Sequence, residues 1–125
     1  MLKDRNSSAI VAVADLGRAR RFYEETLGLT VVDDGGAVLT FATGGTHLVV
    51  YRSDEAGSNR ANAVAWGVGD EIETIVADLR GKGVRFEQYD MDGVQFAEGL
   101  HRAGDFRMAW FKDPDGNILH LNSAD

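Results

Sequence analysis

The sequence contains no cysteine, and this absence narrows the chemistry open to the protein. Disulfide bonds, zinc–thiolate sites, iron–sulfur clusters and cysteine nucleophiles are all excluded. The sequence also lacks the run of about 18 apolar residues that a membrane-spanning helix needs, and Met1 to Asn6 lack the apolar core of a signal peptide. We therefore expect a cytoplasmic protein without a membrane partner, whose chemistry uses oxygen and nitrogen groups.

Basic residues are fewer than acidic ones. The chain has 13 Lys and Arg against 20 Asp and Glu, a formal net charge of −7 at pH 7. Such a chain repels phosphate backbones, so we expect no nucleic-acid partner. The simplest effect of the charge is solubility. The alternative is an acidic cleft that attracts a cationic ligand, with its charge supplied by Glu87, Asp90, Asp92 and Glu98.

The length of 125 residues is typical of one domain, and we expect a single domain over residues 1–125. Its first half begins with an apolar strand, Ala9 to Val13. A helix follows, which Asp15 caps and Gly28 ends. The apolar residues of this helix recur at helical spacing, at Leu16, Ala19, Phe22, Tyr23 and Leu27.

The same order of elements returns in the second half. A strand from Val64 to Val68 precedes a second helix, which ends at Gly81 and Gly83. Asp70 and Glu73 have the spacing of a capping box, so we expect Asp70 to cap this helix. The second half therefore repeats the strand, capped helix and glycine stop of the first.

The two halves also align residue by residue. A shift of 55 positions places Val13 on Val68 and Gly28 on Gly83, which is typical of a duplication. Further strand-like runs complete the halves, at residues 30–33, 37–42 and 47–51, and at 84–89, 107–112 and 118–121. The sequence thus predicts an α+β domain of two βαβββ modules, at about residues 7–53 and 62–123.

The closing hairpins of the two halves align only at a shift of 72 positions, which places Gly44 on Gly116. The second half therefore holds 17 extra residues between Phe86 and Arg107. This stretch is polar and contains several glycines, so we expect a loop over residues 87–105. A long loop inside a compact domain is either a functional lid or a mobile segment, and both interpretations stay open.

Two motifs resemble those of the vicinal oxygen chelate superfamily, which includes glyoxalases, bleomycin-resistance proteins and ring-cleaving dioxygenases. The first is the run from Asp15 to Tyr23 with Leu27-Gly28-Leu29. The second is the closing hairpin Ala109 to Ile118, where Pro114 starts a turn that Gly116 can complete with positive φ. The resemblance implies sheets curled into a cup, a small-molecule ligand inside it, and a homodimer.

The resemblance also implies four positions at the centre of the cup, where metal-using relatives carry their ligands. Here they are Ser8, Leu48, Ala63 and His120. A single histidine does not hold a divalent ion, so we expect no metal and no other cofactor. The alternative is a divalent ion bound by His120 together with His47, which a one-residue slip in strand register would bring inward.

Strand alternation assigns side chains to the cup. Leu48 and Val50 share one face of their strand, and His47 lies on the other. Trp110 precedes the Asp-Pro turn, where a ring can stack on a flat ligand. The predicted ligand-binding residues are Ser8, Ile10, Leu48, Val50, Ala63, Ala65, Trp110 and His120.

Three further side chains have alternative roles. His120 is the candidate catalytic residue, as a general base or hydrogen-bond donor near neutral pH. His101 falls in the predicted loop, where we expect it to be solvated or at an interface. Trp66 shares a face with Val64 and Val68, so we expect it to pack against a helix.

These observations favour a metal-free domain that binds a small organic molecule, aromatic or cationic, in the cup. The alternative is an enzyme of the lyase, isomerase or dioxygenase type that uses His120 as metal ligand or general base. A third interpretation is a regulatory or structural dimeric module.

Overall fold

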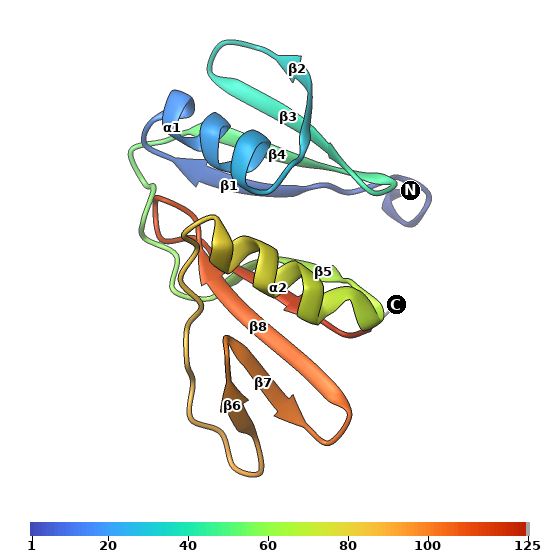
Figure 1. The fold of residues 1–125 in the computed structure, drawn as a ribbon. Helices are drawn as coiled ribbons and strands as arrows, with labels where there is room; N and C mark the ends of the chain where they lie inside the picture. The colour runs from blue at the N-terminus through green and yellow to red at the C-terminus, as the bar shows by residue number, and fades with distance from the viewer. Residues whose placement is uncertain (125) are drawn as a thin grey trace. The chain divides into compact units, whose positions relative to one another are not determined.

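The structure is a computed structural model and describes residues 1–124. The chain divides into two compact units, Met1–Asn59 and Arg60–Asp125. Each unit contains one sheet with a helix on one of its faces (Figure 1). The fold is therefore of the α+β class, as predicted. None of the helices in residues 1–124 has the length and apolarity that crossing a membrane requires.

The first unit contains a four-stranded sheet in the order β1-β4-β3-β2. Its strands are β1 (Ala9–Val13), β2 (Thr30–Asp34), β3 (Val38–Thr43) and β4 (Thr46–Arg52). Strands β1 and β4 pair in parallel, while β4, β3 and β2 are antiparallel neighbours. A short 3-10 turn, η1 (Leu2–Asp4), precedes the sheet.

The first helix begins and ends where the sequence predicts. Helix α1 (Leu16–Arg20) continues as a π-helical segment, η2 (Arg21–Thr26). The Asp15 carboxylate accepts a hydrogen bond from the Arg18 backbone N–H at 3.0 Å, which also lowers the pKa of Asp15. Gly28 follows with a φ of +78°, a conformation open to glycine at little cost.

The core of the first unit lies between this helix and one face of the sheet. Tyr23 of the π-helical segment is completely buried, and its ring lies 5.8 Å from that of Phe41 on β3. The other core residues alternate along the strands or lie on the helix; they are Val11, Val13, Ala19, Leu39, Leu48 and Val50. Burial of these side chains drives the packing of the helix on the sheet.

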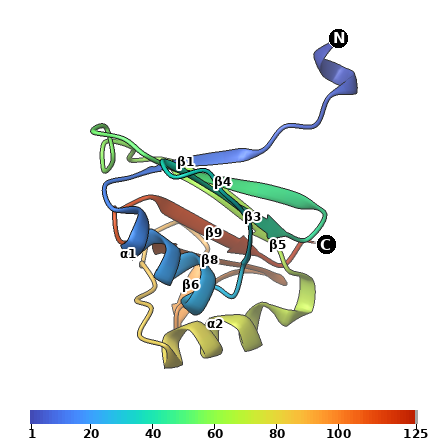
Figure 2. The same cartoon turned by 90° about the horizontal axis from the view of Figure 1, so that it is seen from above.

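The second unit contains a five-stranded sheet in the order β5-β9-β8-β7-β6. Its strands are β5 (Asn62–Gly67), β6 (Gln95–Ala97), β7 (Leu100–Ala103), β8 (Phe106–Lys112) and β9 (Ile118–Asn122). Strands β5 and β9 pair in parallel, and the other neighbours are antiparallel. A 3-10 turn, η3 (Gly69–Glu71), leads into helix α2 (Ile72–Gly81), which covers one face of the sheet (Figure 2).

Helix α2 contributes Ile72, Val76 and Leu79 to the core of the second unit. They pack with buried residues of the sheet, namely Leu100, Ala109, Phe111, Leu119 and Leu121. Trp66 pairs with Leu121, so it lies on this helix-covered face, as predicted.

The predicted cap of helix α2 is wrong. The N-cap residue is Glu71, and Asp70 lies in the preceding 3-10 turn. The carboxylates of Asp70 and Glu73 instead accept hydrogen bonds from the guanidinium of Arg107 on β8. Sequence spacing could not reveal this competing partner, because Arg107 is distant in the chain.

The predicted strand over residues 84–89 and the predicted loop over 87–105 are also wrong. Within residues 84–89 only Phe86 pairs, in an isolated bridge to Phe111. The supposed loop contains β6 and β7, joined by a tight turn at Glu98 and Gly99, whose φ values are +54° and +86°. Positive φ at both central residues is typical of a type I′ hairpin turn, which usually contains Asn-Gly or Asp-Gly. Glu-Gly is a weaker signal for the same turn.

The turn between β8 and β9 is built around Asp113, which is 4% exposed. Its carboxylate accepts hydrogen bonds from the backbone N–H groups of Asp115 and Asn117, both at 2.9 Å, and from the Asn117 side-chain amide at 2.8 Å. Gly116 completes the turn with a φ of +87°, as predicted. This turn holds β8 and β9 in register.

We expect the substitution Asp113→Ala to lower the free energy of unfolding by about 3 kcal/mol, because it leaves several donors without an acceptor. Urea denaturation measures the loss. The control is Asp105→Ala, which changes an exposed residue in the turn between β7 and β8. Equal losses in the two variants would contradict the account of this turn.

Candidate ligand-binding site

The strand register separates the helix-covered face of each sheet from its open face. In the first unit Leu48 and Val50 are 1% and 0% exposed and belong to the core. The prediction that they line the ligand-binding face is therefore wrong. Val49 pairs with Ile10, so the open face of this sheet carries Ile10, Val49 and, by alternation, His47.

Ser8 and Ile10 differ in their surroundings. Ile10 lies on the open face of the first sheet and is 60% exposed. Ser8 precedes β1 and is exposed outside the strand. Their role in ligand binding stays a prediction.

The open face of the second sheet brings together three of the predicted residues. His120 on β9 pairs with Ala65 on β5 on one side and with Trp110 on β8 on the other. Gly67 pairs with Asn122 on the same face. Ala63 falls at an irregularity in the register of β5 with β9, so alternation does not place it.

Trp110 and His120 form a stacked pair. Their ring centroids are 4.7 Å apart and their planes differ by 29°. Both side chains are partly exposed, so a ligand can reach the parts of the two rings that do not face one another. Ala65 beside the pair is small and exposed, whereas the space over Gly67 is occupied by the Ala124 carbonyl, which lies 2.8 Å from the position a Cβ would take.

The hydrogen bonds of His120 fix its tautomer. Nδ1 lies 3.1 Å from the Ala109 carbonyl, which only accepts, so Nδ1 carries the proton. Nε2 is then the acceptor for the Asn122 side-chain amide at 3.3 Å. Burial lowers the pKa of His120, which favours a neutral ring at pH 7. His120 therefore has a basic nitrogen at neutral pH, and Asn122 caps it.

His101 belongs to the same face, which contradicts its predicted place in a solvated loop. It lies on β7 opposite Met108 of β8 and is 0% exposed. Its ring centroid is 4.9 Å from that of Trp110 and 4.7 Å from that of Phe96 on β6. Burial lowers the pKa of His101 as well.

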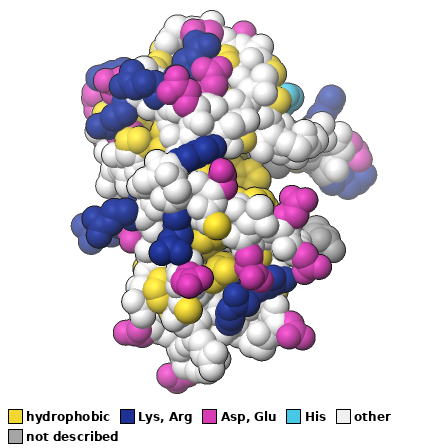
Figure 3. Space-filling view, viewed as in Figure 1, with side chains coloured by type: hydrophobic (Ala, Val, Ile, Leu, Met, Phe, Trp, Pro, Cys, Tyr) yellow, Lys and Arg dark blue, Asp and Glu magenta, His cyan; other side chains and the backbone are white. Residues whose placement is uncertain are grey.

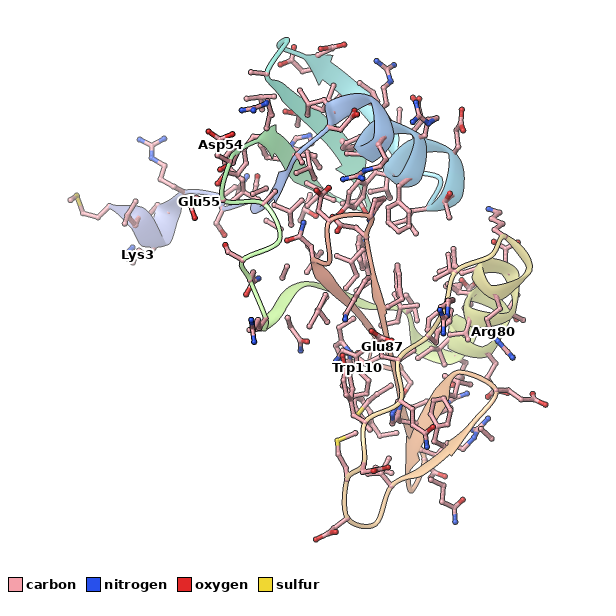
Figure 4. All side chains as sticks on the ribbon, turned by 90° about the vertical axis from the view of Figure 1, so that its left-hand side faces the viewer. Lys3, Asp54, Glu55, Arg80, Glu87 and Trp110 are labelled. Atoms are coloured by element: carbon pink, nitrogen blue, oxygen red, sulfur yellow. The ribbon has the colours of Figure 1, made fainter. Side chains whose placement is uncertain are left out.

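The segment of residues 87–92, which we call the strap, passes beside this cluster between α2 and β6. The backbone N–H of Glu87 donates to the Trp110 carbonyl at 2.8 Å, and Figure 4 shows these two residues as neighbours. The Tyr89 ring stands edge-on to that of Trp110, with centroids 5.3 Å apart and an interplanar angle of 76°. The Tyr89 ring of the strap, which we call the Tyr89 wall, therefore stands beside the stacked pair of Trp110 and His120.

Both acidic and basic side chains lie near the cluster of Trp110, His120 and His101. Lys112 lies on the same face of β8 as Trp110 and pairs with Glu87 at 3.1 Å. Asp90 and Asp92 are exposed on the strap. Acidic and basic side chains are also interspersed over the face of the molecule drawn in Figure 3.

A metal ion in a protein needs several converging donors. In residues 1–124 no three His, Asp or Glu side chains are grouped in a way that could hold one. The predicted positions Ser8 and Ala63 offer no strong ligand, and both ring nitrogens of His120 have hydrogen-bond partners.

An open groove lies apart from the Trp110 pair, at the junction of α2 and the β6–β7 hairpin. Its volume is about 490 Å³, and Phe86 and Phe96 are half-buried in its wall. The other lining residues are Arg80, Gly83, Val84, Arg85, Glu98 and Gly99. The groove contains Glu98 of the predicted acidic cleft, but none of the eight residues that strand alternation assigns to ligand binding.

Comparison with known families identifies the chain. The model of the glyoxalase/bleomycin resistance protein/dioxygenase superfamily matches residues 7–121, almost the whole sequence. The chain belongs to this superfamily. The resemblance stated from the Asp15 and Asp113 motifs is thereby confirmed. A search of curated proteins found no match.

Solved structures of the superfamily share the fold. A glyoxalase family protein from Enterococcus faecalis has a TM-score of 0.73 and 22% identity, over 98% of this chain and 99% of that one. The fosfomycin resistance protein FosX from Mesorhizobium loti has a TM-score of 0.71 and 17% identity, over 98% and 93%. Lactoylglutathione lyase from Agrobacterium tumefaciens has a TM-score of 0.68 and 17% identity, over 94% and 92%. At these identities the likeness concerns the fold alone.

Proposed function

We propose that this superfamily member binds a small planar organic molecule, without a metal ion, on the open face of its second sheet. The observation that carries the proposal is the stacked pair of Trp110 and His120. Partly exposed rings next to the small, exposed Ala65 suit a planar ligand, because ring stacking needs area and a close approach. Tyr89 adds an upright ring at the side of this pair.

The aromatic rings of the site and the carboxylates of the strap indicate which ligand charge the site favours. Aromatic faces attract organic cations, and the carboxylates of Asp90 and Asp92 add a negative potential. Lys112 is already paired with Glu87, so its charge is partly offset. We therefore favour a planar cation over a planar anion.

Thermal-shift screening with neutral, cationic and anionic bicyclic arenes tests this proposal, with bleomycin as a further probe. A ligand that binds the native state raises the melting temperature as its concentration increases. We expect stabilisation by cations above all. A set in which no compound stabilises the protein at millimolar concentration would contradict the proposal.

Metal independence leads to a separate prediction. Calorimetric titration of nickel, zinc, manganese or iron(II) is expected to show no stoichiometric binding, because His120 lacks companion ligands. The control titrates the same ions into the variant His120→Ala. Stoichiometric binding by the wild type that this variant abolishes would contradict the prediction.

The second candidate function is an enzyme in which His120 acts as general base. Its neutral state at pH 7 and the acceptor role of Nε2 favour this candidate. The solved relatives include a lactoylglutathione lyase and fosfomycin resistance proteins, which makes turnover a natural second test. A compound that the wild type converts and His120→Ala binds but does not convert would establish the enzyme.

The superfamily resemblance also supports a homodimer in the cytoplasm, and we include both in the proposal. Light scattering after size-exclusion chromatography measures the assembly. A mass of about twice the 13.6 kDa chain is the expected result.

A further inference from the structure

The strap of residues 87–92 is attached to the second sheet at few points. Glu87 anchors its start through the Trp110 carbonyl and through Lys112. At its middle the backbone N–H of Tyr89 donates to Nε2 of His101 at 2.9 Å. The residues beyond are exposed, and Tyr89 and Met91 are 37% and 39% exposed. The bond to His101 therefore fixes the part of the strap that contacts Trp110.

This hydrogen bond requires a neutral His101. A backbone N–H can only donate, so Nε2 must offer a lone pair and the ring proton must be on Nδ1. Nδ1 is buried and makes no hydrogen bond of good geometry. The ring lies among Phe96, Trp110 and Tyr89, with the Tyr89 ring stacked at 6.2 Å and 26°. The surroundings are thus arranged for an uncharged imidazole.

We propose that His101 is a proton-sensitive latch, which holds the strap and its Tyr89 wall against Trp110 when neutral and releases them when protonated. Protonation of Nε2 would place two donors, Nε2–H and the Tyr89 N–H, against each other. The aromatic rings offset part of the cost of a buried cation, but they supply no acceptor for the new N–H. Opening of the strap lets both groups reach water.

Burial disfavours the protonated form of His101, and the backbones of Tyr89 and Met108, which raise its pKa, offset this only in part. The strap contributes Tyr89, whose phenol is neutral over the pH range concerned, and Glu87, which is paired with Lys112. Strand β6 contributes Phe96, and β8 contributes Met108 and Trp110, none of which titrates. His120 lies across the Trp110 ring, and burial lowers its pKa as well.

The lowered pKa of His101 sets the direction in which pH changes the stability of the closed strap. Burial lowers the pKa of His101 in the closed state, so the closed state binds fewer protons than the open one. The closed state is fully favoured above the ordinary imidazole pKa, about 6.5, and loses its advantage as the pH falls below it. For the ligand site, which rests on the proposed function, this means that acidification removes the Tyr89 wall and weakens binding.

Nuclear magnetic resonance of 15N-labelled protein between pH 8 and pH 4.5 tests the latch without any ligand. At pH 8 we expect the Nδ1–H tautomer of His101 and a Tyr89 amide protected from exchange. As His101 protonates, protection of that amide, corrected for the intrinsic rate, is expected to fall about tenfold with the same midpoint. Core amides of β9, such as that of Leu121, provide the internal reference and are expected to keep their protection.

Two variants separate the histidines. His101→Gln offers a side-chain oxygen that can accept from Tyr89 but does not titrate, so the Tyr89 amide is expected to stay protected at low pH. His120→Gln is the matched control and is expected to retain the wild-type response. The latch is overturned if the Tyr89 amide stays protected while His101 titrates in the wild type, or if His120→Gln alone removes the response. The wild-type titration decides the matter even if a variant does not fold.

A binding experiment tests whether the latch controls the affinity of the ligand site. For any arene that stabilises the protein at pH 8, affinity is expected to fall about tenfold with the His101 midpoint in the wild type, and to stay constant in His101→Gln. An affinity that falls equally in both proteins would overturn the coupling. Absence of binding at every pH would contradict the proposed function and leave the latch to be decided by the Tyr89 amide.

Discussion

Replacing Trp110 by alanine is expected to weaken the binding of a planar organic ligand about thirtyfold or more, the effect of losing a central aromatic contact. Trp110 lies at the centre of the site, because its ring contacts those of Tyr89, His101 and His120. Its loss removes the stacking surface and the support of the Tyr89 wall together. Titration calorimetry with an arene that stabilises the wild type measures the change.

The matched control for this variant is Trp66→Phe. Trp66 lies on the helix-covered face of the same sheet, where a bound ligand has no access to it. We expect the affinity of the Trp66→Phe variant for the arene to equal that of the wild type within about twofold. If Trp110→Ala binds the arene as tightly as the control does, the ligand makes no significant contact with Trp110.

Phe111→Ala, one residue further along the same strand, is expected to lower the free energy of unfolding by about 3–5 kcal/mol. Phe111 is 1% exposed on the opposite face, where its ring lies 5.3 Å from that of Phe86. Truncation leaves a cavity under α2 that the surrounding strands can only partly fill. Urea denaturation followed by circular dichroism measures the loss.

Phe106→Ala provides the control on the same strand with the same change of side chain. Phe106 is 42% exposed, so its truncation is expected to cost less than about 1 kcal/mol. Similar losses at Phe106 and Phe111 would mean that β8 does not separate a core face from an open face as described here.

The helices and their buried residues could be predicted from the sequence because apolar spacing and glycine stops are local signals. Tyr23 and Val76 are buried as the helical stripes require, and Gly28 ends the first helix with positive φ. The cap of the second helix could not be predicted, since Arg107 binds the carboxylates that a capping box would use. Local spacing carries no information about a partner more than thirty residues away.

The face of β4 shows a different limit. This strand has apolar side chains on both faces, Leu48 and Val50 on one and Val49 and Tyr51 on the other, so alternation cannot choose between them. The parallel pairing with β1 decides, because Val50 pairs with the buried Val11. On β8 and β9 the predicted residues Trp110 and His120 do share the open face, since Ala109 and Leu121 clearly mark the core.

The sequence places His101 in a loop because the turns on either side of β7 have weak signatures. Glu98-Gly99 and Gly104-Asp105 both form two-residue turns, but neither is the Asn-Gly or Asp-Gly pair that marks a hairpin most strongly. The available signal is the pair Gly99 and Gly104, which flank the four-residue run Leu100 to Ala103. Recognised as a strand, that run would have placed His101 on the face of Met108 and Trp110.

The proposed function requires that a planar organic molecule bind on the open face of the second sheet. The most direct measurement is the side-chain indole N–H resonance of Trp110 in 15N-labelled protein, assigned with Trp66→Phe, during titration with the cationic and neutral arenes. The account predicts that stabilising arenes shift this resonance in a saturable way, together with the side-chain amide of Asn122. Arenes that stabilise the protein while these two signals stay fixed, and that shift Arg80 and Arg85 in the groove or the first unit instead, would contradict it.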